Sequence, residues 1–127
     1  MAVRTPTFPR SGLTTIDQVL WEGLATGDTG LPVKFAKFSD KSVHIYGTFS
    51  GGTTVVLQGS NDPRANPDHA DHASAVWTGL TDAQGNAISV TAAAIEQVLE
   101  NPLWIRPSVA SGSSDSITVS LVGKKTP

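Results

Sequence analysis

Two histidines on a polar stretch are the residues of this sequence best suited to bind a metal. His69 and His72 flank Asp71 within NDPRANPDHADHAS, which covers residues 61–74. Imidazole and carboxylate are ligands that zinc accepts. The stretch has two prolines and no apolar pattern, so it is expected to form a long loop, whose ligands have no fixed geometry without tertiary support. His44 would complete a site only if the fold brought it near, and we predict no metal site.

The triplet Asp28-Thr29-Gly30 matches the motif of aspartic proteases, in which two Asp side chains share one proton. In those enzymes two apolar residues precede the triplet on a strand, whereas Thr26-Gly27 precede it here. We therefore interpret the triplet as a turn. No grouping of Ser, His and Asp stands out, and the chain has no cysteine for a thiolate nucleophile or ligand. The sequence predicts no catalytic residue, no cofactor and no enzymatic activity.

The glycines of GTFSGGT, residues 47–53, are spaced like those of a phosphate-binding loop, which presents backbone amides and a lysine at a helix N-terminus. This stretch has no lysine. Residues 42–49 and 53–58 alternate apolar and polar side chains on either side of Gly51-Gly52, as β-strands do. Glycine adopts positive φ without steric cost, so we predict a hairpin that turns at this pair.

Composition argues against two classes of partner. The net charge is -2, and nine Lys and Arg residues give no basic field for a nucleic-acid backbone. No run of about eighteen apolar residues is present to cross a membrane. Only 16% of the residues are charged, while small and β-branched residues are abundant, which favours a β-rich chain or a surface that packs against other proteins. We predict neither a nucleic-acid partner nor a membrane partner.

The pattern of the whole chain predicts a mainly all-β fold with six to eight short strands. Residues 16–24 fit a short helix as well as a strand, and clearer strands are expected at 33–38, 42–49, 53–58, 77–80, 88–90, 103–109 and 117–122. The turn at 82–86 predicts a second hairpin. Residues 91–100, TAAAIEQVLE, are good helix formers with Thr91 as a possible N-cap and Pro102 as a barrier, so they predict a helix of about two turns.

These elements predict an antiparallel β-sandwich or jelly-roll-like domain with one short helix. Residues 1–12 contain Pro6 and Pro9 without periodicity and are expected to form an extended N-terminal arm, leaving 13–127 as a single domain. Trp77 and Trp104 lie in strands and are expected to pack in the core, with exposure at a partner or sugar site as the alternative. Arg106 is expected at a strand edge, with an intersubunit salt bridge as the sharper possibility.

Three stretches within residues 43–125 carry a family resemblance: VHIYGTFSGGTTVVLQGSND, WTGLTDAQGNAISVTAAAIEQVLENPLWIRPSV and SDSITVSLVGKK. Together they resemble the short virion structural proteins of tailed bacteriophages, above all the head decoration, or cement, proteins. The resemblance implies a dimer or trimer on the capsid exterior that bridges neighbouring copies of the major capsid protein, with the arm as a strap. Repeated by symmetry, many weak contacts act together. It carries over no catalytic residue.

Contacts with a partner are expected from the arm, from the 61–74 loop and from the strand near 106. The candidate residues are Arg4, Phe8, Arg10, Asn61, Asp62, Arg64, His69, His72 and Arg106. Two other functions remain open. QGSND followed by WTGL is similar to discoidin-like jelly rolls with a Trp near a sugar site, which favours a carbohydrate-binding or adhesin-type module. A phage tail or adaptor component would have the same β-rich style.

Overall fold

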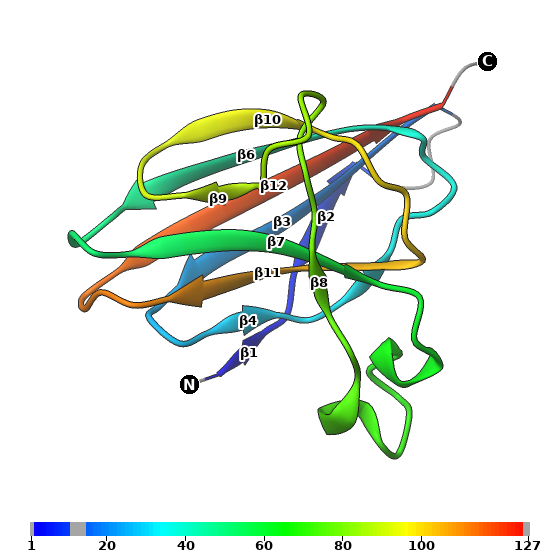
Figure 1. Cartoon of the computed structure of the whole chain (residues 1–127), viewed down its shortest axis with the longest axis horizontal. Helices are drawn as coiled ribbons and strands as arrows, with labels where there is room; N and C mark the ends of the chain where they lie inside the picture. The colour runs from blue at the N-terminus through cyan, green and yellow to red at the C-terminus, as the bar shows by residue number, and fades with distance from the viewer. Residues whose placement is uncertain (1, 11–14, 126–127) are drawn as a thin grey trace.

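The strands form two sheets that pack face to face, as Figure 1 shows, and the chain passes between the sheets several times. The structure is a computed structural model, and it describes residues 2–10 and 15–125. In this part of the chain, one sheet has seven strands: β1 (Val3–Arg4), β4 (Thr29–Gly30), β5 (Val33–Lys34), β7 (Thr54–Ser60), β8 (Thr78–Gly79), β9 (Ser89–Val90) and β11 (Trp104–Ala110). The other has five: β2 (Thr7–Arg10), β3 (Ile16–Leu24), β6 (Asp40–Thr48), β10 (Ala94–Val98) and β12 (Ser116–Lys124). The predicted β-sandwich of jelly-roll-like character is confirmed.

The core lies between the sheets because each long strand turns alternate side chains inward. In β12 the inward positions are apolar and Thr118 and Val122 face outward, which is the half-buried pattern expected from the sequence. The five-stranded sheet contributes Val19, Trp21, Val43, Ile45, Ile117, Val119 and Leu121, and the seven-stranded sheet contributes Val55, Leu57, Ile105 and Val109. Each fully buried large side chain contributes about 1.5–3 kcal/mol relative to an exposed one.

The predicted helix at residues 91–100 is wrong, because this stretch contains strand β10. β10 pairs antiparallel with β6, from Ala94 opposite Ile45 to Val98 opposite Lys41. Val98 is thereby buried in the core. The helix propensity of Ala, Glu and Gln amounts to tenths of a kcal/mol per residue, so the burial and strand pairing gained at this sheet edge override it.

The Gly51-Gly52 turn forms, but the predicted hairpin at this pair is wrong. Both glycines have positive φ, 84° and 72°, as predicted. The strands they join belong to different sheets, since β6 lies in the five-stranded sheet and β7 in the seven-stranded sheet. Two strands with an apolar face can bury it either side by side in one sheet or across the core from opposite sheets. A glycine pair between the strands does not distinguish these two arrangements.

The second predicted hairpin exists in reduced form. An antiparallel bridge joins Thr81 to Ala87, and Asp82 accepts hydrogen bonds from the turn amides of Gln84 and Asn86. The flanking strands β8 and β9 do not pair with one another in the part of the chain that the structure describes. Both pair with β7, at successive positions along its edge. The 82–86 turn therefore lies in the segment between two short strands, β8 and β9, that pair one after the other along the same edge of β7.

The structure decides the conformation of two other segments. Residues 16–24, which fitted either a helix or a strand, form β3. The strand expected at 33–38 is reduced to Val33–Lys34, because the chain turns so that Phe35 and Phe38 both enter the core, with ring centroids 4.8 Å apart. Only short 3-10 turns, η1 (Pro63–Ala65) and η2 (His72–Ser74), represent helix among the described residues. None of these is long or apolar enough to cross a membrane.

The N-terminal segment is extended, as predicted, and lies against both sheets. β1 pairs parallel with β4, and β2 pairs antiparallel with β3 at the edge of the five-stranded sheet. Among residues 2–9 the side chains are exposed except for Pro6, which is buried. The boundary expected at residue 12 falls outside the described residues, so the division into arm and domain stays a prediction.

Candidate binding face

Strand β11 builds the candidate site because its residues alternate between the core and the outer face of the seven-stranded sheet. Ile105 and Val109 are buried in the core, so Trp104 and Arg106 point to the other side. The register places Trp104 between Ser60 of β7 and Lys34 of β5. Arg106 lies opposite Gln58, which in turn lies opposite Gly79 of β8. This outer patch, which we call the tryptophan face, consists of Lys34, Gln58, Trp77, Trp104 and Arg106.

Arg106 is held in place from two directions. Its guanidinium carbon lies 4.1 Å from the centre of the Trp77 ring, and its Nε donates to Oε1 of Gln58 at 2.9 Å. Burial lowers the pKa of Arg106, since removing a cation from water disfavours its charge. An arginine stacked on an aromatic ring is attracted by the electron-rich face of that ring. The side chain is therefore positioned before any partner arrives.

A second pair of an aromatic ring and a cation lies beside the first. Nζ of Lys34 is 5.4 Å from the centre of the Trp104 ring. Trp104 is buried, whereas Lys34 is exposed. Leu103, which is exposed, lines a shallow hollow together with Lys34. The face thus combines tryptophan and arginine, residue types that are enriched at the centre of protein interfaces, with the exposed cation of Lys34.

The 61–74 loop is tied to itself through Asp62. This carboxylate accepts from the backbone amides of Arg64 and Val76 and from the Arg64 guanidinium, with distances of 2.9–3.0 Å for the closest contact to each group. The hydrogen bond from the Arg64 side chain, together with the two amides, holds the pKa of Asp62 well below its usual range. Asp62 and Arg64 therefore neutralise one another, and neither leaves an unpaired charge near the tryptophan face.

The histidines are not arranged around a common point. Nδ1 of His72 donates to the carbonyl oxygen of Arg64 at 2.9 Å, and Nδ1 of His69 accepts from the amide of Asp71 at 3.0 Å. His44 lies on β6 in the other sheet, against Tyr46. Among residues 2–10 and 15–125, no group of three or more His, Cys, Asp or Glu side chains is placed to hold a metal ion.

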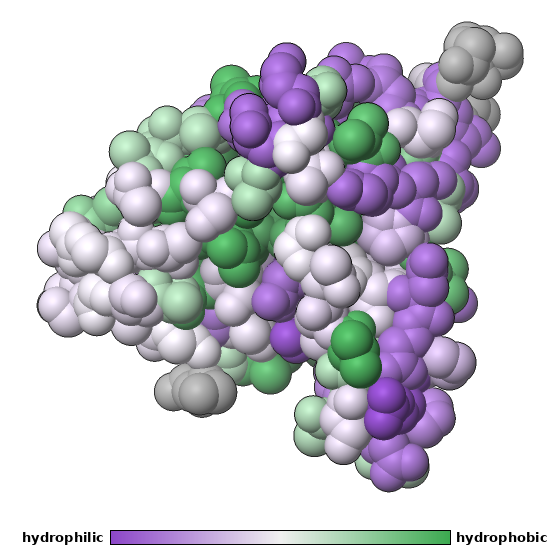
Figure 2. Space-filling model, in the orientation of Figure 1, coloured by the Kyte–Doolittle hydropathy of each residue, from purple (hydrophilic) through white to green (hydrophobic). Residues whose placement is uncertain are grey.

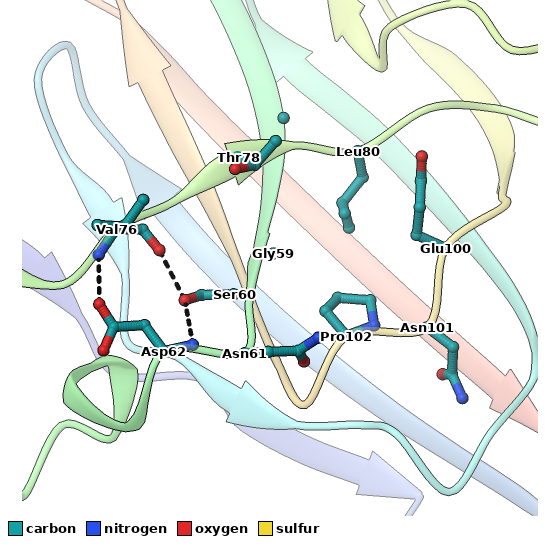
Figure 3. Close-up of a pocket in the computed structure, with 11 residues that line it drawn as sticks. Gly59, Ser60, Asn61, Asp62, Val76, Thr78, Leu80, Glu100, Asn101 and Pro102 are labelled. Atoms are coloured by element: carbon teal, nitrogen blue, oxygen red, sulfur yellow. Dashed lines mark hydrogen bonds between the residues drawn. The ribbon is translucent and has the colours of Figure 1, made fainter.

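A pocket of about 450 Å³ opens between the β7–β8 pair and residues 100–102. Figure 3 shows Thr78, Leu80 and Glu100 on one side and Asn61 and Pro102 on the other. The dashed lines mark the Ser60, Asp62 and Val76 hydrogen bonds that fix its far end. Its volume lies in the range of small-molecule sites, and hydroxyl, amide and carboxylate groups line it beside Leu80 and Pro102.

The structure divides the predicted contact residues between two regions. Asn61, Asp62, Arg64, His69 and His72 lie in the loop that follows β7, and Arg106 lies on β11 next to β7. Arg4 lies on β1, at the opposite edge of the seven-stranded sheet, and Phe8 lies on β2, at an edge of the other sheet. The backbone of Arg10 ends β2, and its side chain lies outside the described part. Figure 2 shows hydrophilic residues over the 61–74 loop at lower right and weakly polar turns at left.

Two expectations about these residues are corrected. Arg106 is not at a strand edge, because β11 has β7 on one side and β4 and β5 on the other. Trp77 is only partly buried, and it stacks on Arg106 instead of joining the core cluster. The sequence reasoning also missed Lys34 and Gln58 as neighbours of these two. The spacing of Trp104 and Arg106, two residues apart on a strand, was the available signal for a shared face.

Asp28, which begins the DTG triplet, has a structural role at a turn, as predicted. Its carboxylate accepts from the amides of Ala2 and Ala25 and from Nε of Arg4, at 2.8–2.9 Å. Burial alone would raise the pKa of Asp28, but the hydrogen bonds from Ala25, Arg4 and Ala2 together lower it. Asp28 therefore anchors the start of the N-terminal segment to the sandwich.

Comparison with known proteins supports the fold. No protein-family model matches the sequence, and the search of curated proteins finds no match. The crystal structure of the SPBc2 prophage-derived protein YomS is similar over 91% of this chain and 100% of that one, with a TM-score of 0.60 and 14% identity. A Neisseria meningitidis protein aligns with a TM-score of 0.40 and 11% identity, over 94% of this chain and 83% of that one. A cupin-superfamily sugar phosphate isomerase from Silicibacter pomeroyi aligns with a TM-score of 0.41 and 15% identity, over 91% and 54%. This chain therefore shares the small β-rich fold of YomS.

Proposed function

We propose that this protein is a structural component of a tailed-phage virion. In this proposal it binds the outside of the assembled capsid as a homodimer or homotrimer and bridges neighbouring copies of the major capsid protein. The observation that carries the proposal is the tryptophan face, where Trp77 stacks on Arg106 and Trp104 lies under Lys34. Tryptophan and arginine are the residues most enriched at binding hot spots. The prophage origin of YomS, whose fold this chain shares, supports a phage context.

Repetition by symmetry explains how such a face would suffice. One face of this size gives a modest contact, but an oligomer presents two or three copies at once. Once one copy is bound, the next binds at a high effective concentration, so the combined affinity exceeds that of each contact. A capsid would then be reinforced without any catalytic chemistry in this chain.

Addition of the purified protein to undecorated capsids of the same phage tests the proposal. Saturable binding, together with greater resistance of the capsid to heat or chelator, is expected. A matched comparison is Trp77→Ala, which removes the stacking surface, beside Tyr46→Ala, which removes an exposed aromatic ring on the opposite sheet. Wild-type protein that fails to bind these capsids would overturn the proposal.

A second candidate is a carbohydrate-binding module, and the pocket between β8 and residues 100–102 favours it. Asn61, Thr78 and Glu100 supply the amide, hydroxyl and carboxylate groups that recognise sugar hydroxyls, and Leu80 and Pro102 supply apolar surface. Arg106 stacks on the Trp77 ring, so the pocket is the better location for a sugar. Glycan-array binding that is lost in Thr78→Ala and kept in Trp77→Ala would establish this function. An array with no binder would exclude it for the glycans presented.

A further inference from the structure

Arg106 carries a positive charge that no acid of the described structure neutralises. The ion pairs there join Arg4 to Asp28, Lys37 to Asp17 and Arg64 to Asp62, and none involves Arg106 or Lys34. Arg106 is nevertheless partly buried on the sheet. A cation that has lost part of its hydration without gaining a counter-ion is a ready receptor for an anion.

The guanidinium is also oriented for two hydrogen bonds to one partner. Gln58 accepts from Nε and Trp77 supports the planar group, so these contacts occupy one edge and one face. Nη1 and Nη2 have no hydrogen-bond partner among the described residues. Two such nitrogens match the two oxygens of a carboxylate, which arginine binds in a bidentate manner. The side-chain entropy of arginine is largely lost already, so little of it opposes binding.

We propose that the tryptophan face is a docking surface for an acidic segment of a partner protein, in which an Asp or Glu carboxylate binds Arg106 through both Nη atoms. Lys34 attracts a second acid of the segment, and the exposed side chain of Leu103, which shares a hollow with Lys34, contacts an apolar residue of the segment. The identity of the partner as the capsid protein rests on the proposed function, whereas the chemistry of the surface does not.

Charge complementarity favours an acidic protein segment over a nucleic acid. A nucleic-acid site needs several clustered cations, but only Arg106 and Lys34 are unpaired on this face, and the whole chain carries a net charge of -2. Two cations beside the exposed aliphatic side chain of Leu103 match a short peptide that alternates acidic and apolar residues.

Titration of the full-length protein with a blocked ten-residue peptide of alternating Glu and Leu tests the docking surface. Tryptophan fluorescence should report saturable binding, because two of the three tryptophans lie on this face. Arg106→Met should weaken binding at least tenfold, and Arg106→Lys should weaken it less. Lys124→Met, which removes an exposed cation from the other sheet, is the matched control and should leave the affinity unchanged.

Gln58→Met gives a second measurement that keeps the guanidinium and removes only its orienting acceptor. It should weaken binding of the Glu-Leu peptide severalfold, with the far-ultraviolet circular dichroism of the wild type. The inference is overturned if wild-type protein does not bind the Glu-Leu peptide, or if Arg106→Met and Gln58→Met both bind it as tightly as wild type does. It is also overturned if wild-type protein binds a Lys-Leu peptide or oligo-dT as tightly as the Glu-Leu peptide. Capsid binding by wild-type protein that Arg106→Met leaves intact would overturn the inference and leave the proposed function standing. Peptide binding without capsid binding would do the reverse.

Discussion

The guanidinium carbon of Arg106 lies 4.1 Å from the centre of the Trp77 ring. Arg106 is on β11 and Trp77 directly precedes β8, and strand β7 lies between these two strands. Gln58 of β7 lies opposite Arg106 of β11 on one side and opposite Gly79 of β8 on the other, and Trp77 comes two residues before Gly79. The contact therefore depends on three strands being in the correct register. The interaction free energy between Arg106 and Trp77 therefore reports whether the two side chains of the tryptophan face are in contact.

A double-mutant cycle on Trp77 and Arg106 should detect a coupling of about 0.5–1 kcal/mol in the free energy of unfolding. Trp77→Ala and Arg106→Met each remove the stacking contact, so the double variant should be less destabilised than the sum of the singles. Urea unfolding followed by circular dichroism measures the three variants. Strictly additive effects would show that the two side chains lie close without interacting.

Asp28→Asn should release the N-terminal segment from the sandwich. Two of the three hydrogen bonds to Asp28 come from backbone amides of Ala2 and Ala25, and an amide side chain cannot accept on both of its ends. Loss of such an acceptor costs about 1–3 kcal/mol. Hydrogen exchange measured by mass spectrometry should show faster exchange of residues 2–10.

Arg4→Met is the matched control for this variant. It removes the ion pair with Asp28 and keeps both backbone hydrogen bonds, and the Arg4 side chain is about half exposed. A pair of that kind contributes about 0–1 kcal/mol. Exchange in residues 2–10 should stay close to wild type, and equal acceleration in both variants would contradict a tether that works through the backbone.

Strands with strict alternation could be predicted from the sequence, because the period of two reports burial directly. This holds for residues 42–48 and 117–122, which lie in β6 and β12. The pairing partner could not be predicted, since Gly51-Gly52 turns the chain in the same way within a sheet or between sheets. The helix that the sequence predicts for residues 91–100 does not form, because intrinsic propensity is a weak preference that pairing with the edge of β6 overrides.

The candidate site shows the same limit. The sequence predicts Arg106 and the 61–74 loop as places for a partner, since charges and long loops are visible in a sequence. It does not predict the stacking of Arg106 on Trp77, because that contact depends on the register of β7 with both β8 and β11. Alternation along β11 assigns a face to Arg106, but the neighbour on that face comes from a distant part of the chain.

Acid should destabilise the fold through Asp115. Its carboxylate accepts from the hydroxyl groups of Thr26 and Thr53 and from the amide of Ser50, and so joins three turns. The hydrogen bonds from Thr26 and Thr53 hold the pKa of Asp115 well below its ordinary value. A carboxylate with a lower pKa in the folded state contributes stability that is complete above the unfolded pKa of about 4 and is lost as the pH falls toward the folded pKa.

The free energy of unfolding should therefore be constant between about pH 5 and pH 7 and decline below about pH 4. Asp28 and Asp62, whose pKa values are also lowered, act in the same direction. Urea unfolding at a series of pH values measures the decline. Asp115→Asn should be less stable at pH 7 and should lose part of the pH dependence. A variant that keeps the full wild-type slope would rule out Asp115 as a contributor.

Gly123→Ala should destabilise the protein by about 1–3 kcal/mol through overpacking. A Cβ at this position of β12 would lie 2.5 Å from ring carbons of both Phe35 and Phe38, and these rings are packed on one another in the core. Gly79→Ala is the matched control, because nothing lies within 4 Å of its Cβ position. Its effect should stay within about 0.5 kcal/mol, as at other open surface positions. Thermal and urea unfolding of the two variants make the comparison, and a Gly123→Ala protein as stable as wild type would show that the phenylalanine pair can shift to accommodate a methyl group.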